Sequence, residues 1–159
     1  MASLFTGSQI VELAIQIEKN GEAFYQAAKK VATSEDAKGV FDYLMSEERR
    51  HSATFQGLLK KLELTRPPES YEGEWDAYLK TAAAEHMFTD DARAKAVIAQ
   101  VKSQGQAIEF AIGFEKDSII LFYELGELVQ GKNKDIVEKL VNEEKEHLRR
   151  LSTLKKILG

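Results

Sequence analysis

The chain has 159 residues, of which 43% are apolar, and this size and composition predict a single domain (1–159) with a substantial core. Its formal net charge of −4 comes from interspersed acidic and basic residues, which form no cationic patch. A nucleic-acid partner is therefore not expected. It contains no cysteine, which excludes disulfides, thiol catalysis and cysteine-ligated metal centres. Carboxylate and imidazole side chains remain as metal ligands.

Targeting signals and membrane segments are not expected. No apolar run approaches the roughly 18 residues of a membrane span, and no basic region followed by a hydrophobic segment begins the chain. The sequence therefore predicts a soluble cytoplasmic protein that does not associate with a membrane. Two prolines and a continuous helix-forming composition predict an all-α fold.

A first helix is expected over residues 8–31, with Ser8 as its cap. Glu18 lies in the middle of its inward line, next to small residues that leave room for a cluster of ligands. Glu22, one turn further along, is the alternative candidate. The inward line reads Val11, Ala14, Glu18, Gly21, Tyr25 and Ala28.

The second helix, expected over residues 35–63, follows a break at Thr33 and Ser34, so it runs antiparallel to the first. Its apolar seam is interrupted by Glu48 and His51. Glu47 could also face the histidine, but Glu48 is in register with the seam. The seam reads Phe41, Leu44, Glu48, His51, Phe55, Leu58 and Leu62.

A long crossover follows. The segment Thr65-Arg66-Pro67-Pro68 is predicted to end the second helix, because proline cannot continue its hydrogen bonding. Two shorter helices are expected over 73–87 and 90–102, and together they allow the third main helix to start at the far end of the bundle. His86, in this connection, has no glutamate at the matching spacing, so a structural or surface role is favoured over metal ligation.

The third main helix is expected over residues 105–129, with Gly131 as a plausible stop. Glu115 lies 97 residues after Glu18, in a matching local pattern that includes a following Phe-Tyr pair. Its inward line reads Ile108, Ile112, Glu115, Ser118 or Ile119, Phe122 and Gly126.

The two Phe-Tyr pairs differ in register. Tyr25 lies seven residues after Glu18, whereas Tyr123 lies eight residues after Glu115. An extra residue inside a helix is commonly absorbed as a π-bulge. A π-bulge is therefore predicted between Glu115 and Tyr123.

The fourth helix, expected over residues 134–158, repeats the seam of the second. Glu144 and His147 lie 96 residues after Glu48 and His51. The chain is therefore interpreted as a duplicated helical hairpin, with Glu143 and Glu146 pointing off the seam. The seam reads Val137, Leu140, Glu144, His147, Leu151, Leu154 and Leu158.

Six polar side chains are thus predicted to converge in the bundle and to bind metal. Burying them without compensation would be costly, whereas two divalent cations would balance the four carboxylates. One Glu from each of two helices and Glu-x-x-His from each of the other two is the ligand set of ferritin-like di-iron and di-manganese bundles. Either Glu48 and Glu144 or Glu18 and Glu115 would bridge the metals. The six residues are Glu18, Glu48, His51, Glu115, Glu144 and His147.

With these six positions at matching spacing over nearly the whole length, the chain resembles the rubrerythrin family of the ferritin-like superfamily. The resemblance implies two iron ions, with manganese or a mixed iron–manganese pair as alternatives. It implies oxidation of the centre by hydrogen peroxide or dioxygen and reduction by an external electron donor such as a rubredoxin-like protein. It also implies a homodimer, and hydrogen bonds from Tyr25 and Tyr123 to ligand carboxylates; core-filling aromatics are the alternative reading of both tyrosines.

Two departures from the family pattern bear on function. Rubrerythrins carry a further Glu one turn after the third-helix ligand, where this chain has Ser118, and Glu22 is a candidate replacement. They also carry a rubredoxin module, which a chain without cysteine lacks. A di-metal peroxidase or oxidase is favoured. Two alternatives remain open: an iron-binding or storage protein without turnover, and a metal-free helical interaction module.

Overall fold

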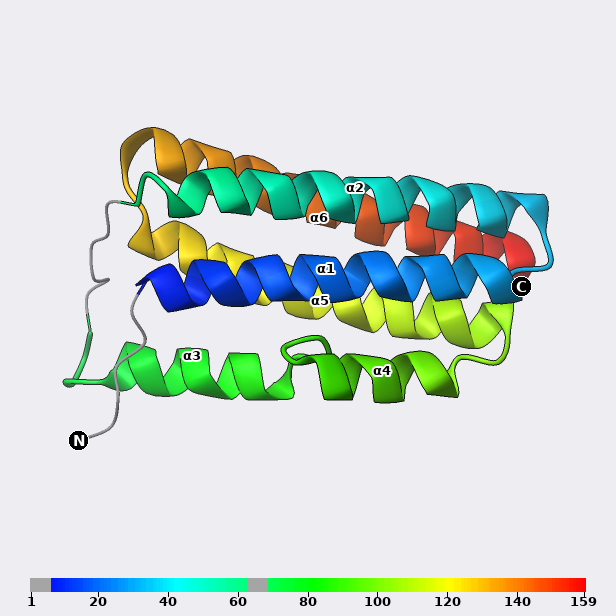
Figure 1. Cartoon of the computed structure of the whole chain (residues 1–159), viewed down its shortest axis with the longest axis horizontal. Helices are drawn as coiled ribbons and strands as arrows, with labels where there is room; N and C mark the ends of the chain where they lie inside the picture. Colours follow the sequence, from blue (N-terminus) through cyan, green and yellow to red (C-terminus); the bar gives the residue numbers. More distant parts are fainter. Residues whose placement is uncertain (1–6, 63–68) are drawn as a thin grey trace.

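A computed structural model of the chain describes residues 7–62 and 69–159. Within these residues the fold is all-α, as predicted, and is a ferritin-like helical bundle (Figure 1). None of the helices described is long and apolar enough to span a bilayer. The helices are α1 (Gly7–Val31), α2 (Glu35–Leu59), α3 (Glu74–Glu85), α4 (Asp91–Gln100), α5 (Gln104–Leu128) and α6 (Gly131–Leu158).

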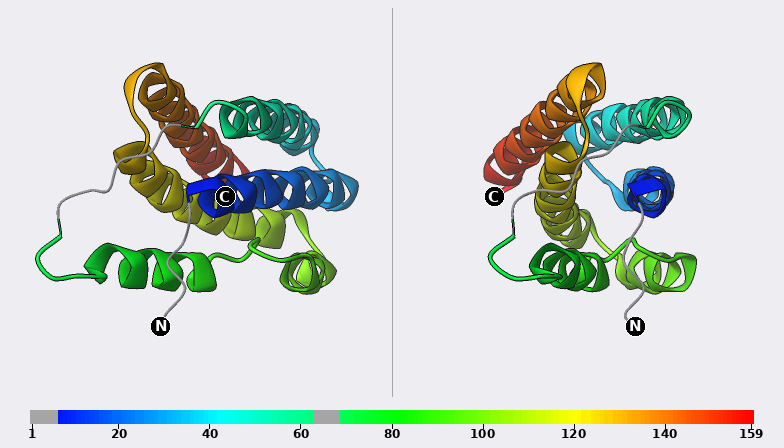
Figure 2. Two further views of the ribbon diagram at one scale, coloured as in Figure 1. Left: turned by 60° about the vertical axis from the view of Figure 1, so that its left-hand side comes forward. Right: turned by 90° about the vertical axis from the view of Figure 1, so that its left-hand side faces the viewer.

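Two helical hairpins, α1–α2 and α5–α6, form the bundle and lie side by side in Figures 1 and 2. α2 ends at Leu59, earlier than predicted, and the proline segment 65–68 lies outside the described residues. Gly131, the predicted stop of the third helix, is instead the first residue of α6. Its left-handed φ of 56° makes the tight turn between the two helices, a conformation that favours glycine.

Side-chain caps set the starts of three helices. Ser34, Asp90 and Ser103 each accept a hydrogen bond from the backbone N–H three residues on, at 3.1, 2.7 and 3.2 Å. Gln104 Oε1 accepts from the backbone N–H groups of Thr33 and Ser34, at 3.0 and 2.9 Å. This contact ties the turn of the first hairpin to the start of α5.

The crossover helices α3 and α4 run along the length of the bundle, so α5 begins at the end where α1 finishes (Figure 1). This is the arrangement predicted for the long connection. Asn20 Nδ2 donates to the Phe88 carbonyl at 3.0 Å, and Phe88 is fully buried. Trp75 Nε1 donates to Glu124 Oε2 at 3.3 Å. The connection is therefore anchored on both α1 and α5.

The core is built from the predicted inward lines of the four long helices. Its aliphatic and aromatic layers lie on both sides of a polar layer in the middle of the bundle. Ring contacts such as Phe55–Phe122, with centroids 4.9 Å apart, fill one side of this layer, and Phe24, Tyr25 and Phe41 fill the other.

The predicted π-bulge is wrong. α5 is a regular α-helix from Gln104 to Leu128. Without a bulge, Phe122 occupies the position seven residues after Glu115 and is buried, whereas the side chain of Tyr123 is 58% exposed. The register difference between the two Phe-Tyr pairs is absorbed by turning Tyr123 outward, because a one-position shift rotates a helical side chain by about 100°.

Candidate metal centre

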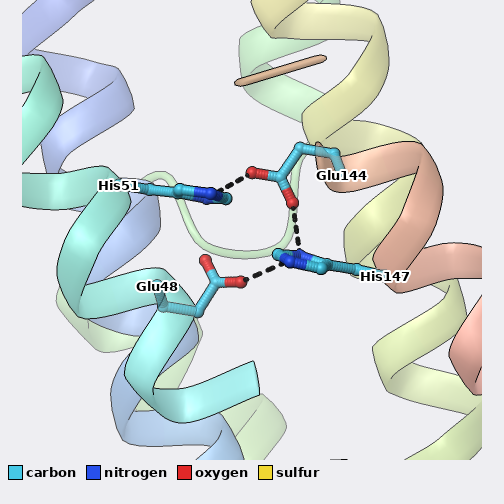
Figure 3. A group of neighbouring side chains, drawn as sticks. All are labelled: Glu48, His51, Glu144 and His147. Carbon is cyan, nitrogen blue, oxygen red and sulfur yellow. Dashed lines mark hydrogen bonds and ion pairs between the residues drawn. The ribbon is translucent and has the colours of Figure 1, made fainter. Parts of the chain in front are cut away.

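All six side chains predicted as metal ligands meet in the polar layer of the bundle. Each of the four long helices contributes to the cluster, and every member is at most 1% exposed. Figure 3 shows the pairs from α2 and α6 pointing toward one another across the bundle. Near atoms of Glu48, His51, Glu144 and His147 lie within 4.8 Å of each other, close enough to hold a metal ion.

Glu144 lies between the two imidazoles. Its Oε1 is 2.7 Å from His51 Nδ1, and its Oε2 is 3.0 Å from His147 Nδ1. The two rings stack with centroids 5.3 Å apart and an interplanar angle of 16°. Both Nδ1 atoms therefore face the inside of the cluster.

The three other carboxylates surround the same Nδ1 atoms. Glu18 Oε2 lies 3.1 Å from His51 Nδ1, while Glu115 Oε2 and Glu48 Oε1 lie 3.6 and 3.8 Å from His147 Nδ1. Four carboxylates and two imidazoles thus share one enclosed volume. The two glutamates contributed by single helices, Glu18 and Glu115, close it from the side of α1 and α5.

Burial shapes the protonation of this cluster. It raises the pKa of Glu18 and Glu48 well above the usual value, and the repulsion among the carboxylates adds to the effect. Burial and the charge of Glu144 raise the pKa of Glu115 to about 8. Burial also opposes ionisation of Glu144, but hydrogen bonds from His147 and His51 outweigh it and hold the pKa of Glu144 far below its usual range.

The pKa values of the two histidines are raised, although burial by itself lowers the pKa of an imidazole. Burial alone would lower the pKa of both imidazoles, but hydrogen bonds and charge from the neighbouring carboxylates outweigh it. The pKa of His51 rises to about 9 and that of His147 to about 10. Without metal, protons therefore provide the positive charge that this layer requires.

Several buried oxygen atoms of the cluster lack a hydrogen-bond partner among the residues that the structure describes. They include Glu18 Oε1, Glu115 Oε2 and both carboxylate oxygens of Glu48. Buried polar atoms are normally paired, and an oxygen-rich, cysteine-free donor set suits iron or manganese. The residues present therefore fit a pair of divalent cations, with Glu and imidazole Nδ1 as ligands.

Tyr25 lies beside the cluster, where a hydrogen bond to a ligand carboxylate was predicted. Its hydroxyl donates a hydrogen bond to Glu115 Oε1. That bond leaves Glu115 Oε2 directed toward His147. Tyr123 does not share this role, because its side chain lies at the surface beside Gly126 and Glu127. The prediction that both tyrosines contact ligand carboxylates therefore needs correction for Tyr123.

The outer ring nitrogens are met by glutamates that the sequence pattern had placed off the seam. His51 Nε2 lies 3.1 Å from Glu143 Oε2, and His147 Nε2 lies 3.8 Å from Glu47 Oε2. Arg50 Nη2 contacts both glutamates, at 2.6 Å from Glu47 and 3.0 Å from Glu143. The hydrogen bond with Glu143 orients the ring of His51, whereas Glu47 is only an ion-pair neighbour of His147. The 96-residue separation of the two glutamates was the signal that could have identified them.

Two other candidates lie outside the cluster. Glu22 accepts from Arg49 Nε and Nη2 at 2.8 and 2.6 Å, so its carboxylate does not replace the family's further glutamate. His86 is buried, and the N–H of Phe88 donates to its Nδ1 at 3.1 Å. Its Nε2–H then donates to Ser118 Oγ at 3.1 Å, and burial lowers the pKa of His86 to about 3. His86 is a structural residue, as favoured by the sequence.

The fold and the cluster together define a ferritin-like carboxylate bundle with a Glu/His metal site. The family model of rubrerythrin matches residues 9–155, and the chain therefore belongs to the rubrerythrin family. A solved structure from Thermotoga maritima, provisionally described as a ferritin-like diiron-carboxylate protein, is 27% identical and superposes with a TM-score of 0.76. The match covers 100% of both chains. The comparison with curated protein sequences finds no match.

Proposed function

We propose that this protein is a di-iron oxidoreductase that reduces hydrogen peroxide or dioxygen with electrons from a separate donor protein. The observation that carries the proposal is the convergence of four carboxylates and two imidazoles in one buried layer, with several oxygens left unpaired among the described residues. Membership of the rubrerythrin family and the diiron-carboxylate likeness support it.

The proposed ligands are Glu18, Glu48, His51, Glu115, Glu144 and His147. When bound, two iron(II) ions would each supply one electron, so that hydrogen peroxide and two protons become two waters. The chain's own residues position these ligands and exclude bulk water from them. Glu143 and Glu47 face the outer ring nitrogens, which leaves Nδ1 of each imidazole for the metal.

Tyr25 has a positioning role in this proposal. Its hydroxyl holds Glu115 Oε1, so the other oxygen of that carboxylate remains directed into the cluster. Ser118 occupies the place of the further glutamate of rubrerythrins, and its hydroxyl is bound to His86. The ligand set is therefore smaller by one carboxylate, and the rate of peroxide turnover is the property most directly affected.

The test compares wild type with Glu115→Ala after reconstitution with iron. We expect wild type to bind two irons per chain and to consume peroxide repeatedly when a reduced electron-transfer protein is supplied. Glu115→Ala should lose at least about tenfold in turnover, since it removes a ligand of the centre. Glu109→Ala, six residues earlier at the exposed start of the same helix, is the matched control and should behave as wild type.

Metal content and turnover separate the alternatives. Two bound irons with a single stoichiometric oxidation, and no repeated consumption of peroxide, would indicate iron binding without turnover. A protein that retains no transition metal after exposure to iron and manganese would indicate a metal-free helical module and would contradict the proposal.

A further inference from the structure

The outer ring nitrogens of His51 and His147 have unequal surroundings, although the two histidines occupy equivalent positions in the duplicated hairpins. His51 Nε2 forms a hydrogen bond with Glu143 Oε2 at 3.1 Å. His147 Nε2 is buried and has no hydrogen-bond partner among the residues that the structure describes. Glu47 Oε2 lies 3.8 Å from it, which is too far for a hydrogen bond. A carboxylate therefore supports one imidazole but not the other.

Arg50 holds both glutamates in these positions. Its Nη2 lies 3.0 Å from Glu143 Oε2, the same oxygen that meets His51. Its Nη2 and Nε also donate to Glu47 at 2.6 and 3.2 Å, and Nη2 binds the oxygen that faces His147. The guanidinium lies 3.3 Å from His51 Nε2 but has no acceptor atom. Once Nδ1 binds a metal, the Nε2–H of His51 can therefore donate only to Glu143 in this group.

The duplication shows that this arginine belongs to the first hairpin alone. Glu47 and Glu143 are counterparts 96 residues apart, whereas the counterpart of Arg50 is Glu146. Glu146 pairs with two arginines of its own helix, three and four residues further along. The second hairpin thus has an anion where the first has the cation that joins α2 to α6.

We propose that Arg50 makes the two metal positions unequal, by holding Glu143 against His51 and keeping Glu47 away from His147. A carboxylate on the outer nitrogen raises the basicity of an imidazole ligand and fixes its ring, and losing such a partner typically costs about 10–100-fold in metal affinity. The position served by His51 therefore takes the first divalent cation, and the position served by His147 takes the second. The inference rests on the proposed di-metal function, in which Arg50 is a positioning residue because it acts through the two glutamates.

The test measures iron(II) binding to the metal-free protein by calorimetry, in the absence of oxygen and peroxide. Two bound cations repel each other, so two steps arise in any such site and the comparison of variants carries the test. Glu143→Ala should weaken the first step by at least about tenfold. Glu47→Ala, which removes the same charge at the matching position, should leave the first step unchanged. Helix content by circular dichroism establishes that each variant is folded.

Exchanging the cation between the hairpins tests Arg50 itself. In the background Arg50→Glu/Glu146→Arg the sensitivity should transfer, because the new arginine lies in the other half of the duplicated site. Glu47→Ala should then weaken the first step by at least about tenfold, and Glu143→Ala should leave it unchanged.

Two results would overturn the inference and leave the proposed function standing. One is an equal effect of the two alanine substitutions on the first step in the otherwise wild-type chain. The other is a folded exchange background that keeps the wild-type pattern. Wild type that binds no iron(II) would overturn both the inference and the proposed function.

Discussion

Glu144 is the residue on which the cluster depends most at the scale of single side chains. Its Oε1 lies 2.7 Å from His51 Nδ1, and its Oε2 lies 3.0 Å from His147 Nδ1. A buried ion pair is weak evidence for stability, because desolvation opposes the attraction between the charges. A layer of four buried carboxylates is therefore better explained by the cations it can hold than by the stability it confers on the empty bundle.

Tyr25→Phe tests the support of Glu115. The substitution keeps the ring in the core but leaves the buried Glu115 Oε1 without the hydroxyl that now donates to it. We expect the free energy of unfolding of the metal-free protein to fall by about 1–3 kcal/mol. Urea denaturation followed by circular dichroism measures this. Tyr78→Phe, in the exposed part of α3, is the control, and an equal loss in both variants would contradict the assigned role.

At the scale of helices, the approach of α1 to the centre of the bundle depends on a missing side chain. A Cβ at Gly21 would lie 2.7 Å from Phe114 Cζ and 3.0 Å from Glu48 Oε2. Phe114 is fully buried and cannot move away without disturbing its neighbours Tyr25 and Phe88. The glycine thus brings α1 close enough for Glu18 to reach His51.

Gly21→Ala should therefore destabilise the protein by about 1–3 kcal/mol, although alanine is the better helix former. Gly39→Ala in α2 is the matched control, because a Cβ there meets nothing within 4 Å and should stabilise the helix by up to about 1 kcal/mol. Thermal unfolding of both variants gives the comparison. Stabilisation of similar size at both positions would show that α1 has room at Gly21.

For the whole molecule, the duplication produces two similar halves whose inner faces match and whose outer faces differ. The inner faces provide the ligands of one metal layer, and the protonation of that layer links metal binding to folding. Burial raises the pKa of Glu115 to about 8, and the carboxylates raise the pKa of His51 and His147 to about 9 and 10. Each group binds its proton more tightly in the folded protein than in the unfolded chain.

The metal-free protein should therefore lose stability as the pH rises. The contribution of these groups is complete below their unfolded pKa values and is lost as the pH passes through the raised folded values. We expect the free energy of unfolding to fall between about pH 6 and about pH 9 in the presence of a chelator. The iron-loaded protein should lack this fall, since cations replace the protons. Greater stability of the metal-free form at the higher pH would contradict the assignment of charge in the layer.

The sequence alone determined the fold class, the four long helices and the six members of the cluster. In a helix that packs on one face, the inward residues recur at alternating spacings of three and four. Polar residues at those positions are therefore recognisable among the apolar ones. Glu48 was distinguished from Glu47 by its register with Leu44 and Phe55. In the structure Leu44, Glu48 and Phe55 are all buried. The duplication strengthened each assignment, because it presented the same seam twice.

Only the tertiary structure decided what lies across the space between helices. The contacts of Glu143 with His51, of Glu47 with His147 and of His86 with Ser118 each join segments far apart in the sequence. The regular course of α5 through Tyr123 was equally a matter of packing, because a helix can absorb an extra residue either by a bulge or by turning one side chain outward. Local spacing specifies which side of a helix a residue occupies, whereas the partner it meets there depends on how whole helices are placed.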